Sequence, residues 1–306
     1  MDLSTRIGKH LLKNPIMNAA GVNCVTEYQL NRLLQTKSCG AIVTKSSTVD
    51  PRQGNPNPRY FSDDFFSINS SGLPNLGIDS YITWIRNNNS NKPCILSISP
   101  MKMDDLSIII KKIKNDDTII DPEINLSCPN IEGKSQVVYD FDTFSLYLRK
   151  LSDGLGDKTY GLKLPPYFDN THFQSIANII NEHPTISYVT CINSIPLGLY
   201  VDIEKERKVI IPNDGFGGFG GPSILPTALA NVNKFSKLLK NKQVIGCGGI
   251  KSGDDIYRHF LCGASAVQIG TTLYNNGVSD FERLTQEFAT IMERKGKSRL
   301  SDIICV

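Results

Sequence analysis

Residues 123–130, with the sequence EINLSCPN, place a thiol, two carboxamides and a hydroxyl at the end of an apolar run. Pro129 cannot donate to a strand ladder, so we expect a buried strand to end near it and to leave Cys128 at the strand tip. A thiol with no charged neighbour in sequence is a poor resting thiolate, but it can act as a general base in a closed site. The alternative interpretation is a buried structural cysteine, which is the more common role of this residue type.

Two lysines belong to apolar runs in which an ammonium group is costly to bury. Lys45 ends the run AIVTK, and Lys163 lies inside the run YGLKL. We expect such a lysine to stay buried only where an anion or a polar ligand meets it. Either side chain could instead extend to water from the end of a barrel. The two lysines therefore indicate a binding site if both reach the same place.

Asparagines follow apolar runs in the same way. Asn125 ends one predicted strand, the pair Asn193 and Ser194 ends another, and Asn69 belongs to a segment rich in Pro, Gly and Asn. Each asparagine alone is most often a turn or cap residue. Together they supply both donors and acceptors, which suits a planar ligand with amide edges if they converge at one rim.

Three glycine clusters occur in the second half of the chain, at residues 216–221 (FGGFGG), 247–250 (CGGI) and 269–271 (IGT). Glycine permits close backbone approach and positive φ, so successive N–H groups can surround a phosphate. The loops after strands seven and eight of a barrel are the usual phosphate site of that fold. The last two clusters therefore predict a phosphorylated ligand.

These residues must be positioned by short apolar runs that alternate with helical patterns. We predict eight buried strands, at residues 16–18, 41–45, 94–98, within 119–126, and at 160–164, 187–192, 243–247 and 266–269. Helices are predicted at residues 26–36, 104–114, 141–151, 172–182, 253–261 and 280–295, the fifth of them with an N-cap at Ser252. This order predicts an α/β fold, a (β/α)₈ TIM barrel, in one domain spanning residues 1–306.

Three further features complete this predicted barrel. Residues 3–7 and 10–12 predict an N-terminal hairpin. Two long excursions, at residues 50–75 after strand two and 195–222 after strand six, are expected to build the site or its lid; the second contains candidate strands at 199–203 and 208–211. A doubly wound sheet is the main alternative, but no GxGxxG motif follows the first strand.

Composition excludes several classes of protein. The 306 residues are 40% hydrophobic and carry a formal net charge of +3 without a basic tract, so neither nucleic acid nor an anionic membrane is indicated as a partner. The eight cysteines form no CxxC pair, which argues against a metal site and against a disulfide scaffold. No signal peptide or membrane-spanning run is recognised, so we expect a cytoplasmic protein.

The motifs, taken in order, resemble those of the dihydroorotate dehydrogenases, in particular the cytosolic class 1A branch. The resemblance spans almost the whole chain. It rests on NAAG (18–21), TKS (44–46), PRQGNPNPRY (51–60), INSSGLPN (68–75), NLSCPN (125–130), KLPPYF (163–168), CINS (191–194), GGFGG (217–221), LPTALAN (225–231), GCGG (246–249) and QIGT (268–271).

This resemblance implies an FMN-containing barrel that oxidises (S)-dihydroorotate to orotate and passes electrons to fumarate, giving succinate, as a homodimer. It implies Cys128 as the general base, with Lys45 also at the catalytic centre. It implies that substrate contacts come from Lys45, Asn69, Gly72, Leu73, Asn125, Asn130, Asn193 and Ser194. Cofactor contacts would come from Ala20, Gly21, Lys45, Ser46, Asn69, Asn125, Lys163, Ile192, Gly221, Gly248, Gly249, Gly270 and Thr271. No metal is implied.

Three alternatives stay open. A class 1B enzyme is also cysteine-based but passes electrons to NAD through an iron–sulfur partner. A tRNA-dihydrouridine synthase is another FMN barrel, although the near-neutral charge weighs against RNA binding. A non-catalytic protein could keep the fold, because fold alone does not prove activity. The sequence departs from the family pattern at Ser71, Pro196, Leu197 and Pro222, and none of these is a proposed catalytic residue.

Overall fold

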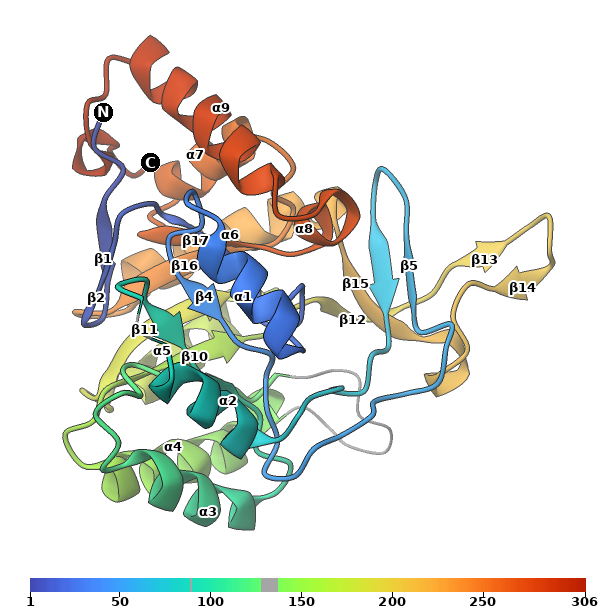
Figure 1. The fold of residues 1–306 in the computed structure, drawn as a ribbon, viewed down its shortest axis with the longest axis vertical. Helices are drawn as coiled ribbons and strands as arrows, with labels where there is room; N and C mark the ends of the chain where they lie inside the picture. The colour runs from blue at the N-terminus through green and yellow to red at the C-terminus, as the bar shows by residue number, and fades with distance from the viewer. Residues whose placement is uncertain (89, 128–136) are drawn as a thin grey trace.

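The structure is a computed structural model, and it describes residues 1–88, 90–127 and 137–306. Parallel strands at its centre form the barrel that the sequence predicts (Figure 1). Seven of them form one sheet in the order β3-β17-β16-β11-β10-β9-β8. Their bounds are Ile16–Asn18 (β3), Ser97–Ile98 (β8), Glu123–Asn125 (β9), Tyr160–Leu164 (β10), Ile186–Cys191 (β11), Gln243–Cys247 (β16) and Ala266–Ile269 (β17).

The strand β4 (Ile42–Val43) and one side chain close the barrel between β3 and β8, the first and last strands of this sheet. The strands β4 and β7 (Cys94–Ile95) pair in parallel, and β7 continues into β8 after a single residue. On the other side, Asn18 of β3 donates through Nδ2 to the carbonyl of Val43 at 2.7 Å and accepts from Val43 N at 2.9 Å. The amide of Gly40 also donates to the carbonyl of Ile16 at 2.8 Å. The asparagine thus replaces part of a strand ladder, and the eight-strand prediction is confirmed.

Helices surround the strands, and most begin and end within a few residues of the predicted bounds. They are α1 (Glu27–Gln35), α3 (Met103–Ile113), α4 (Phe141–Leu155), α5 (Asn170–Asn181), α7 (Gly253–Leu261) and α9 (Asp280–Arg294). Local chemistry explains the starts: Thr26 and Gln29 form a capping box before α1, and Ser252 and Asp255 form one before α7. The predicted N-cap at Ser252 is therefore confirmed.

Two helices of the barrel were not predicted. They are α2 (Ile78–Arg86), which follows Gly77, and α6 (Leu225–Leu238), which has Pro226 in its first turn. Glycine and proline read as breaks in a pattern, yet proline is well tolerated in the first turn of a helix. The short helix α8 (Thr271–Asn276) follows β17 directly and precedes α9.

The N-terminal hairpin covers the amino ends of the strands. It consists of β1 (Thr5–Ile7) and β2 (His10–Leu12), as predicted. The amide of Gly8 donates to Gln243 Oε1 at 2.7 Å, and the amide of Lys9 donates to Asp121 Oδ2 at 2.6 Å. Because Gln243 begins β16 and Asp121 precedes β9, the hairpin lies at the end of the barrel opposite the carboxyl ends of the strands.

The two excursions come together in one antiparallel sheet beside the barrel. Its order is β12-β15-β6-β5, with bounds Ile195–Gly198 (β12), Gly217–Gly220 (β15), Ser67–Asn69 (β6) and Tyr60–Ser62 (β5). A hairpin of β13 (Val201–Asp202) and β14 (Arg207–Lys208) extends away from it (Figure 1). The predicted strands at 199–203 and 208–211 are thus shorter than expected, and the second is shifted. Pairing between β6 and β15, about 150 residues apart in the chain, produces this sheet, so local patterns did not reveal it.

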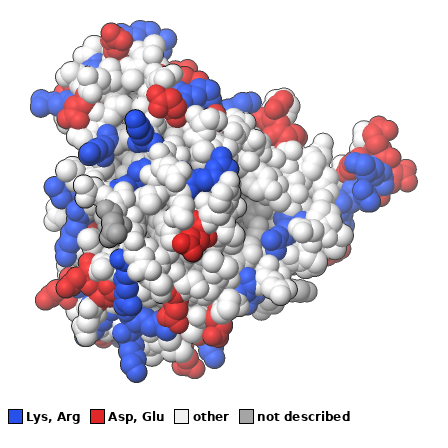
Figure 2. Space-filling model, in the orientation of Figure 1, with Lys and Arg blue, Asp and Glu red and all other residues white. Residues whose placement is uncertain are grey.

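The surface in Figure 2 carries lysine and arginine intermixed with aspartate and glutamate. The hairpin of β13 and β14 carries both positive and negative side chains at its tip. In the described part of the chain, no helix has the length and apolar character needed to cross a membrane. Across residues 1–88, 90–127 and 137–306, no group of three His, Cys, Asp or Glu side chains is placed to hold a metal ion. The cysteines that the structure describes are all free thiols.

Candidate active site

A cavity of about 410 Å³ lies at the carboxyl ends of the barrel strands, within the roughly 300–1,000 Å³ typical of small-molecule sites. Most of the residues named from the sequence line it: Ala20, Gly21, Lys45, Ser46, Asn69, Leu73, Asn125, Lys163, Ile192, Asn193, Ser194, Gly221, Gly248, Gly249, Gly270 and Thr271. Gly72 is not among the lining residues and lies against Asn55. Cys128 and Asn130 lie outside the described residues.

Both lysines are buried and reach this cavity. Lys163 is 5% exposed and Lys45 is 8% exposed. The Lys163 ammonium donates to Gln268 Oε1 at 2.8 Å, which leaves its other N–H bonds available to the cavity that it lines. The cavity therefore has two cationic groups in its wall, an arrangement that favours an anionic or electron-rich ligand.

Carboxamides and hydroxyls from neighbouring strand ends form a connected network beside Lys163. Asn125 donates through Nδ2 to Ser46 Oγ at 3.1 Å. Asn193 donates through Nδ2 to the carbonyl and the hydroxyl of Ser127, both at 3.1 Å. The Ser127 hydroxyl in turn contacts the carbonyl of Lys163 at 2.9 Å. Ser127 is fully buried and is the residue before Cys128, so this network fixes where the chain leaves the barrel.

The sheet formed by the excursions brings further polar groups to the mouth of the cavity. Asn69 at the end of β6 donates through Nδ2 to the carbonyl of Gly218 in β15 at 3.3 Å. A Cβ on Gly218 would lie 2.1 Å from Ser194 Oγ and 3.3 Å from Asn69 Nδ2, so only glycine allows β15 to approach these two residues. The glycine-rich sequence of the second excursion thus permits Asn69 and Ser194 to face the same cavity.

The other end of the cavity is lined mainly by backbone. Gly221, Gly248, Gly249 and Gly270 come from three loops, and Thr271 contacts Ser67 through their hydroxyls at 2.8 Å. Gly249 has φ of 78°, and a Cβ there would lie 2.4 Å from Leu225 Cα at the start of α6. A side chain at this position is therefore excluded by both conformation and space. Exposed backbone N–H groups in such loops suit a phosphate group.

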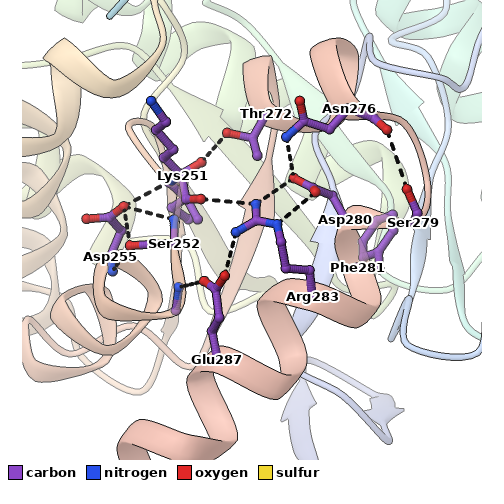
Figure 3. Close-up of polar contacts among 12 residues, drawn as sticks. Lys251, Ser252, Asp255, Thr272, Asn276, Ser279, Asp280, Phe281, Arg283 and Glu287 are labelled. Carbon is purple, nitrogen blue, oxygen red and sulfur yellow. Dashed lines mark hydrogen bonds and ion pairs between the residues drawn. The ribbon is translucent and has the colours of Figure 1, made fainter. Parts of the chain in front are cut away.

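A charged network from α9 supports these loops from behind (Figure 3). Arg283 donates to both carboxylate oxygens of Asp280, at 3.0 and 2.8 Å, to Glu287 Oε1 at 2.7 Å and to the carbonyl of Lys251 at 3.2 Å. The Thr272 hydroxyl donates to the carbonyl of Ile250 at 2.6 Å. Hydrogen bonds to Asp280 and Glu287 raise the pKa of Arg283. The segments after Gly249 and Thr271 are therefore tied together and to α9.

A buried histidine supports the same loops from within α7. His259 is fully buried, and its Nε2 lies 3.1 Å from the carbonyl of Gly248. Because a carbonyl only accepts, the proton must be on Nε2 in this hydrogen bond. Burial lowers the pKa of His259 to about 4, so the imidazole is neutral at physiological pH. The histidine holds the Gly248 peptide by its carbonyl.

Sequence reasoning missed several residues that shape this site. Gln268 lies in the apolar strand AVQI, just as Lys163 lies in YGLKL, so the same signal was present for both. Ser67 precedes Asn69 on the same face of β6, but its contact with Thr271 depends on chain folding. Arg283 lies on the polar side of a helical pattern and gave no signal that separates it from other surface arginines.

Comparison with known proteins agrees with this geometry. A family model described as dihydroorotate dehydrogenase matches residues 2–292. The chain belongs to the dihydroorotate dehydrogenase family. A relative named dihydroorotate dehydrogenase (fumarate) from Trypanosoma brucei brucei is 46% identical over 99% of this chain and 97% of that protein. One of the same name from Saccharomyces cerevisiae is 48% identical over 96% of this chain and 95% of that protein.

Solved structures show the same fold. The ligand-free dihydroorotate dehydrogenase of Eimeria tenella has a TM-score of 0.83 at 20% identity and covers 99% of this chain and 91% of its own. The complex of that enzyme with ferulenol gives a TM-score of 0.81, with 99% of this chain and 88% of that chain covered. Dihydroorotate dehydrogenases are flavin-dependent. A cavity with a cationic end and a glycine-lined end is compatible with a flavin ligand.

Proposed function

We propose that this chain, folded as one domain, oxidises (S)-dihydroorotate to orotate in pyrimidine biosynthesis, with FMN as cofactor and fumarate as electron acceptor. The observation that carries the proposal is the composition of one cavity. Two buried ammonium groups and a set of carboxamides line one end, and glycine loops after β16 and β17 line the other. The full-length relatives named dihydroorotate dehydrogenase (fumarate) support the substrate and the acceptor.

The residues of the cavity fit FMN at both of its ends. Gly221, Gly248, Gly249, Gly270 and Thr271 would hold the phosphate through backbone N–H groups and one hydroxyl. Ala20, Gly21, Ser46, Asn69, Asn125 and Ile192 would contact the ring system, with Lys45 and Lys163 beside it. A buried ammonium stabilises negative charge that develops on a neighbouring ring, which gives Lys163 a reason to lie inside a strand.

The carboxamide cluster would bind the substrate. Asn69, Asn125, Asn193 and Ser194 present donors and acceptors to the same space, matching the carboxylate and the amide edges of dihydroorotate. Lys45 would contribute positive charge near the substrate, and Leu73 would provide an apolar wall. Asn130 and Gly72 would complete the set on the evidence of the family motifs in the sequence.

Cys128 is the proposed general base, which takes the proton from C5 of the substrate. Bound FMN supplies the acceptor for the hydride that leaves C6. Ser127, the preceding residue, accepts hydrogen bonds from Asn193, which lines the cavity. The role of Cys128 itself is proposed from the NLSCPN motif in the sequence. Positioning of base and acceptor on opposite sides of one C–C bond would contribute to the rate, because oriented groups react without a further loss of translational and rotational entropy.

Anaerobic reduction tests this proposal directly. Purified protein reconstituted with FMN is mixed with dihydroorotate, and loss of the yellow flavin absorbance is followed. Fumarate, NAD and a quinone are then added to separate samples of the reduced protein. We expect bleaching by dihydroorotate and rapid return of the colour with fumarate only. No bleaching would contradict the proposed reaction, and recovery with NAD or quinone instead would contradict the proposed acceptor.

Assembly as a homodimer and a cytoplasmic location are part of the same proposal, and both rest on the class 1A motifs in the sequence. Light scattering on the purified protein tests the first, with a mass of twice 33.9 kDa expected. A mass of 33.9 kDa at working concentrations would contradict the dimer.

A further inference from the structure

Four polar side chains meet inside the barrel, below the cavity. Lys163 of β10, Glu123 of β9, Gln268 of β17 and Thr190 of β11 are exposed by 5%, 0%, 1% and 0%, respectively. Lys163 and Gln268 line the cavity, whereas Glu123 and Thr190 are not part of its lining. The cluster therefore extends from the cavity wall into the closed interior.

The hydrogen bonds of this cluster have a fixed direction. The Lys163 ammonium donates to Gln268 Oε1 at 2.8 Å, and Gln268 Nε2 donates to Glu123 Oε2 at 2.8 Å. The hydroxyl of Thr190 donates to the same Glu123 oxygen at 2.8 Å. An ammonium can only donate, and a carboxylate can only accept, so the amide of Gln268 has one orientation that satisfies both. A cation and an anion are thus connected through a single carboxamide.

Burial of the Glu123 carboxylate in the interior of the barrel costs free energy, because the group loses its contacts with water. Branched apolar residues usually occupy such positions, and a buried carboxylate needs partners for both oxygens. Among the described residues, Glu123 Oε1 has no hydrogen-bond partner. The charge of Glu123 also contributes, after burial, to the raised pKa of Tyr188 beside it. A stability role alone does not account for a buried charge that is only half satisfied.

We propose that Glu123 is a positioning residue that acts through Gln268 on Lys163. The carboxamide holds the ammonium at the cavity wall, and the carboxylate behind it partly offsets the positive charge that the flavin ring experiences. This inference rests on the proposed function, because it assigns Lys163 to the ring end of the cavity. It predicts that substitutions of Glu123 and of Gln268 change the chemistry of the bound flavin in opposite directions.

Sulfite binding and the two-electron midpoint potential of the FMN-loaded protein measure this charge without turnover. Sulfite adds to oxidised flavin to give an anionic adduct, so its affinity rises with positive charge at the ring. Glu123→Gln keeps the hydrogen bond to Gln268 and removes the negative charge. We expect sulfite to bind roughly tenfold more tightly, the size expected for one unit charge over about 10 Å at an effective dielectric constant near 20. The midpoint potential should rise by about 30 mV, the two-electron equivalent of tenfold.

Gln268→Met tests the positioning half of the proposal, because it keeps the charge of Glu123 and removes the bridge. Lys163 then loses its acceptor, and we expect sulfite to bind several-fold more weakly. Thr190→Val is the matched control: it removes a donor to the same carboxylate oxygen but leaves both charge and bridge, and should stay within twofold of wild type.

An unchanged sulfite affinity in Glu123→Gln would overturn the charge effect, and an unchanged affinity in Gln268→Met would overturn the positioning. A Thr190→Val effect as large as that of Glu123→Gln would assign the change to packing. If Glu123→Gln does not fold, Gln268→Met still decides the positioning. Failure of wild-type protein to be bleached by dihydroorotate contradicts the proposed function instead, and sulfite titration reports on the cluster in either case.

Discussion

The two ends of the cavity are built by opposite means. At the glycine end, which comprises Gly221, Gly248, Gly249, Gly270 and Thr271, backbone lines the cavity, and the side chains of Arg283 and His259 hold that backbone from behind. At the lysine end, which comprises Lys45, Lys163 and the neighbouring carboxamides, side chains line the cavity, and strand backbone holds them in place. The glycine end should therefore respond to substitutions by changing affinity for a ligand group of fixed shape. The lysine end should respond by changing reaction rate and redox chemistry, because its charges can be altered one at a time.

The largest expected effect is on the rate of the proposed reaction. Cys128→Ser replaces the proposed base with a much weaker acid–base group, so reduction of bound FMN by dihydroorotate should slow about 10²–10⁴-fold, the usual contribution of a general base. Stopped-flow absorbance measures the rate, and the FMN content of the purified variant should equal that of wild type. A rate within a factor of three of wild type would place the base elsewhere.

At the glycine end, His259 should make the stability of the fold depend on pH. Its pKa is about 4 in the folded protein and about 6.5 when unfolded, so the unfolded chain binds more protons between these values. The stabilisation is fully present above about pH 6.5 and is lost as the pH falls toward 4, by up to about 3 kcal/mol in total.

Urea unfolding of wild type and His259→Gln between pH 4.5 and 7 measures this, and the variant should show the weaker pH dependence. His172→Gln, on the exposed start of α5, is the control and should follow wild type. Parallel pH profiles for wild type and His259→Gln would contradict the account of a buried neutral imidazole.

Gly249→Val tests whether the glycine end needs its backbone geometry. The substitution adds a branched side chain at φ of 78°, where a Cβ would already lie 2.4 Å from Leu225 Cα. We expect FMN affinity to fall about 100-fold or more, since strain and displacement of the loop each cost on the order of 1–3 kcal/mol. Quenching of flavin fluorescence measures the affinity. Gly156→Val is the control for backbone strain alone. Gly156 also has a positive φ, of 63°, but a Cβ there would meet no atom within 4 Å.

Arg283→Met should have the smallest effect on this end. The substitution keeps much of the side-chain length and removes the hydrogen bonds to Asp280, Glu287 and the carbonyl of Lys251, so the loop after Gly249 loses one support. We expect FMN to bind about tenfold more weakly, equivalent to about 1.4 kcal/mol, as for loss of a hydrogen bond from a charged donor. The reduction rate of FMN-saturated protein should be unchanged.

Arg294→Met on the same helix is the matched control, because within the described part of the chain Arg294 makes only a long ion pair with Asp254, at 3.9 Å. Equal affinities for FMN in Arg283→Met and Arg294→Met would show that the network in Figure 3 does not support the loops.

The difference between the two ends also explains what the sequence could predict. Strand positions, the three glycine loops and the lysines in apolar runs were visible because each depends on local composition. The antiparallel sheet of the excursions was not, since Asn69 pairs with Gly218 across about 150 residues. The Lys163–Gln268–Glu123 chain was hidden for the same reason: three strands distant in sequence meet only when the barrel closes. The contact of Arg283 with the loop at Lys251 could not be predicted from the sequence pattern of its own helix.

We propose that the glycine end of the cavity binds the phosphate of FMN and that the lysine end binds its ring system. The most direct measurement compares FMN with riboflavin, which lacks the phosphate, in binding to apoprotein of wild type and Gly249→Val. We predict that wild type binds FMN at least about 100-fold more tightly than riboflavin and that the substitution removes most of this difference, because charge-assisted contacts to the phosphate are lost. Equal affinities of wild type for FMN and riboflavin would contradict the assignment of the glycine loops to a phosphate, and with it the account of this site.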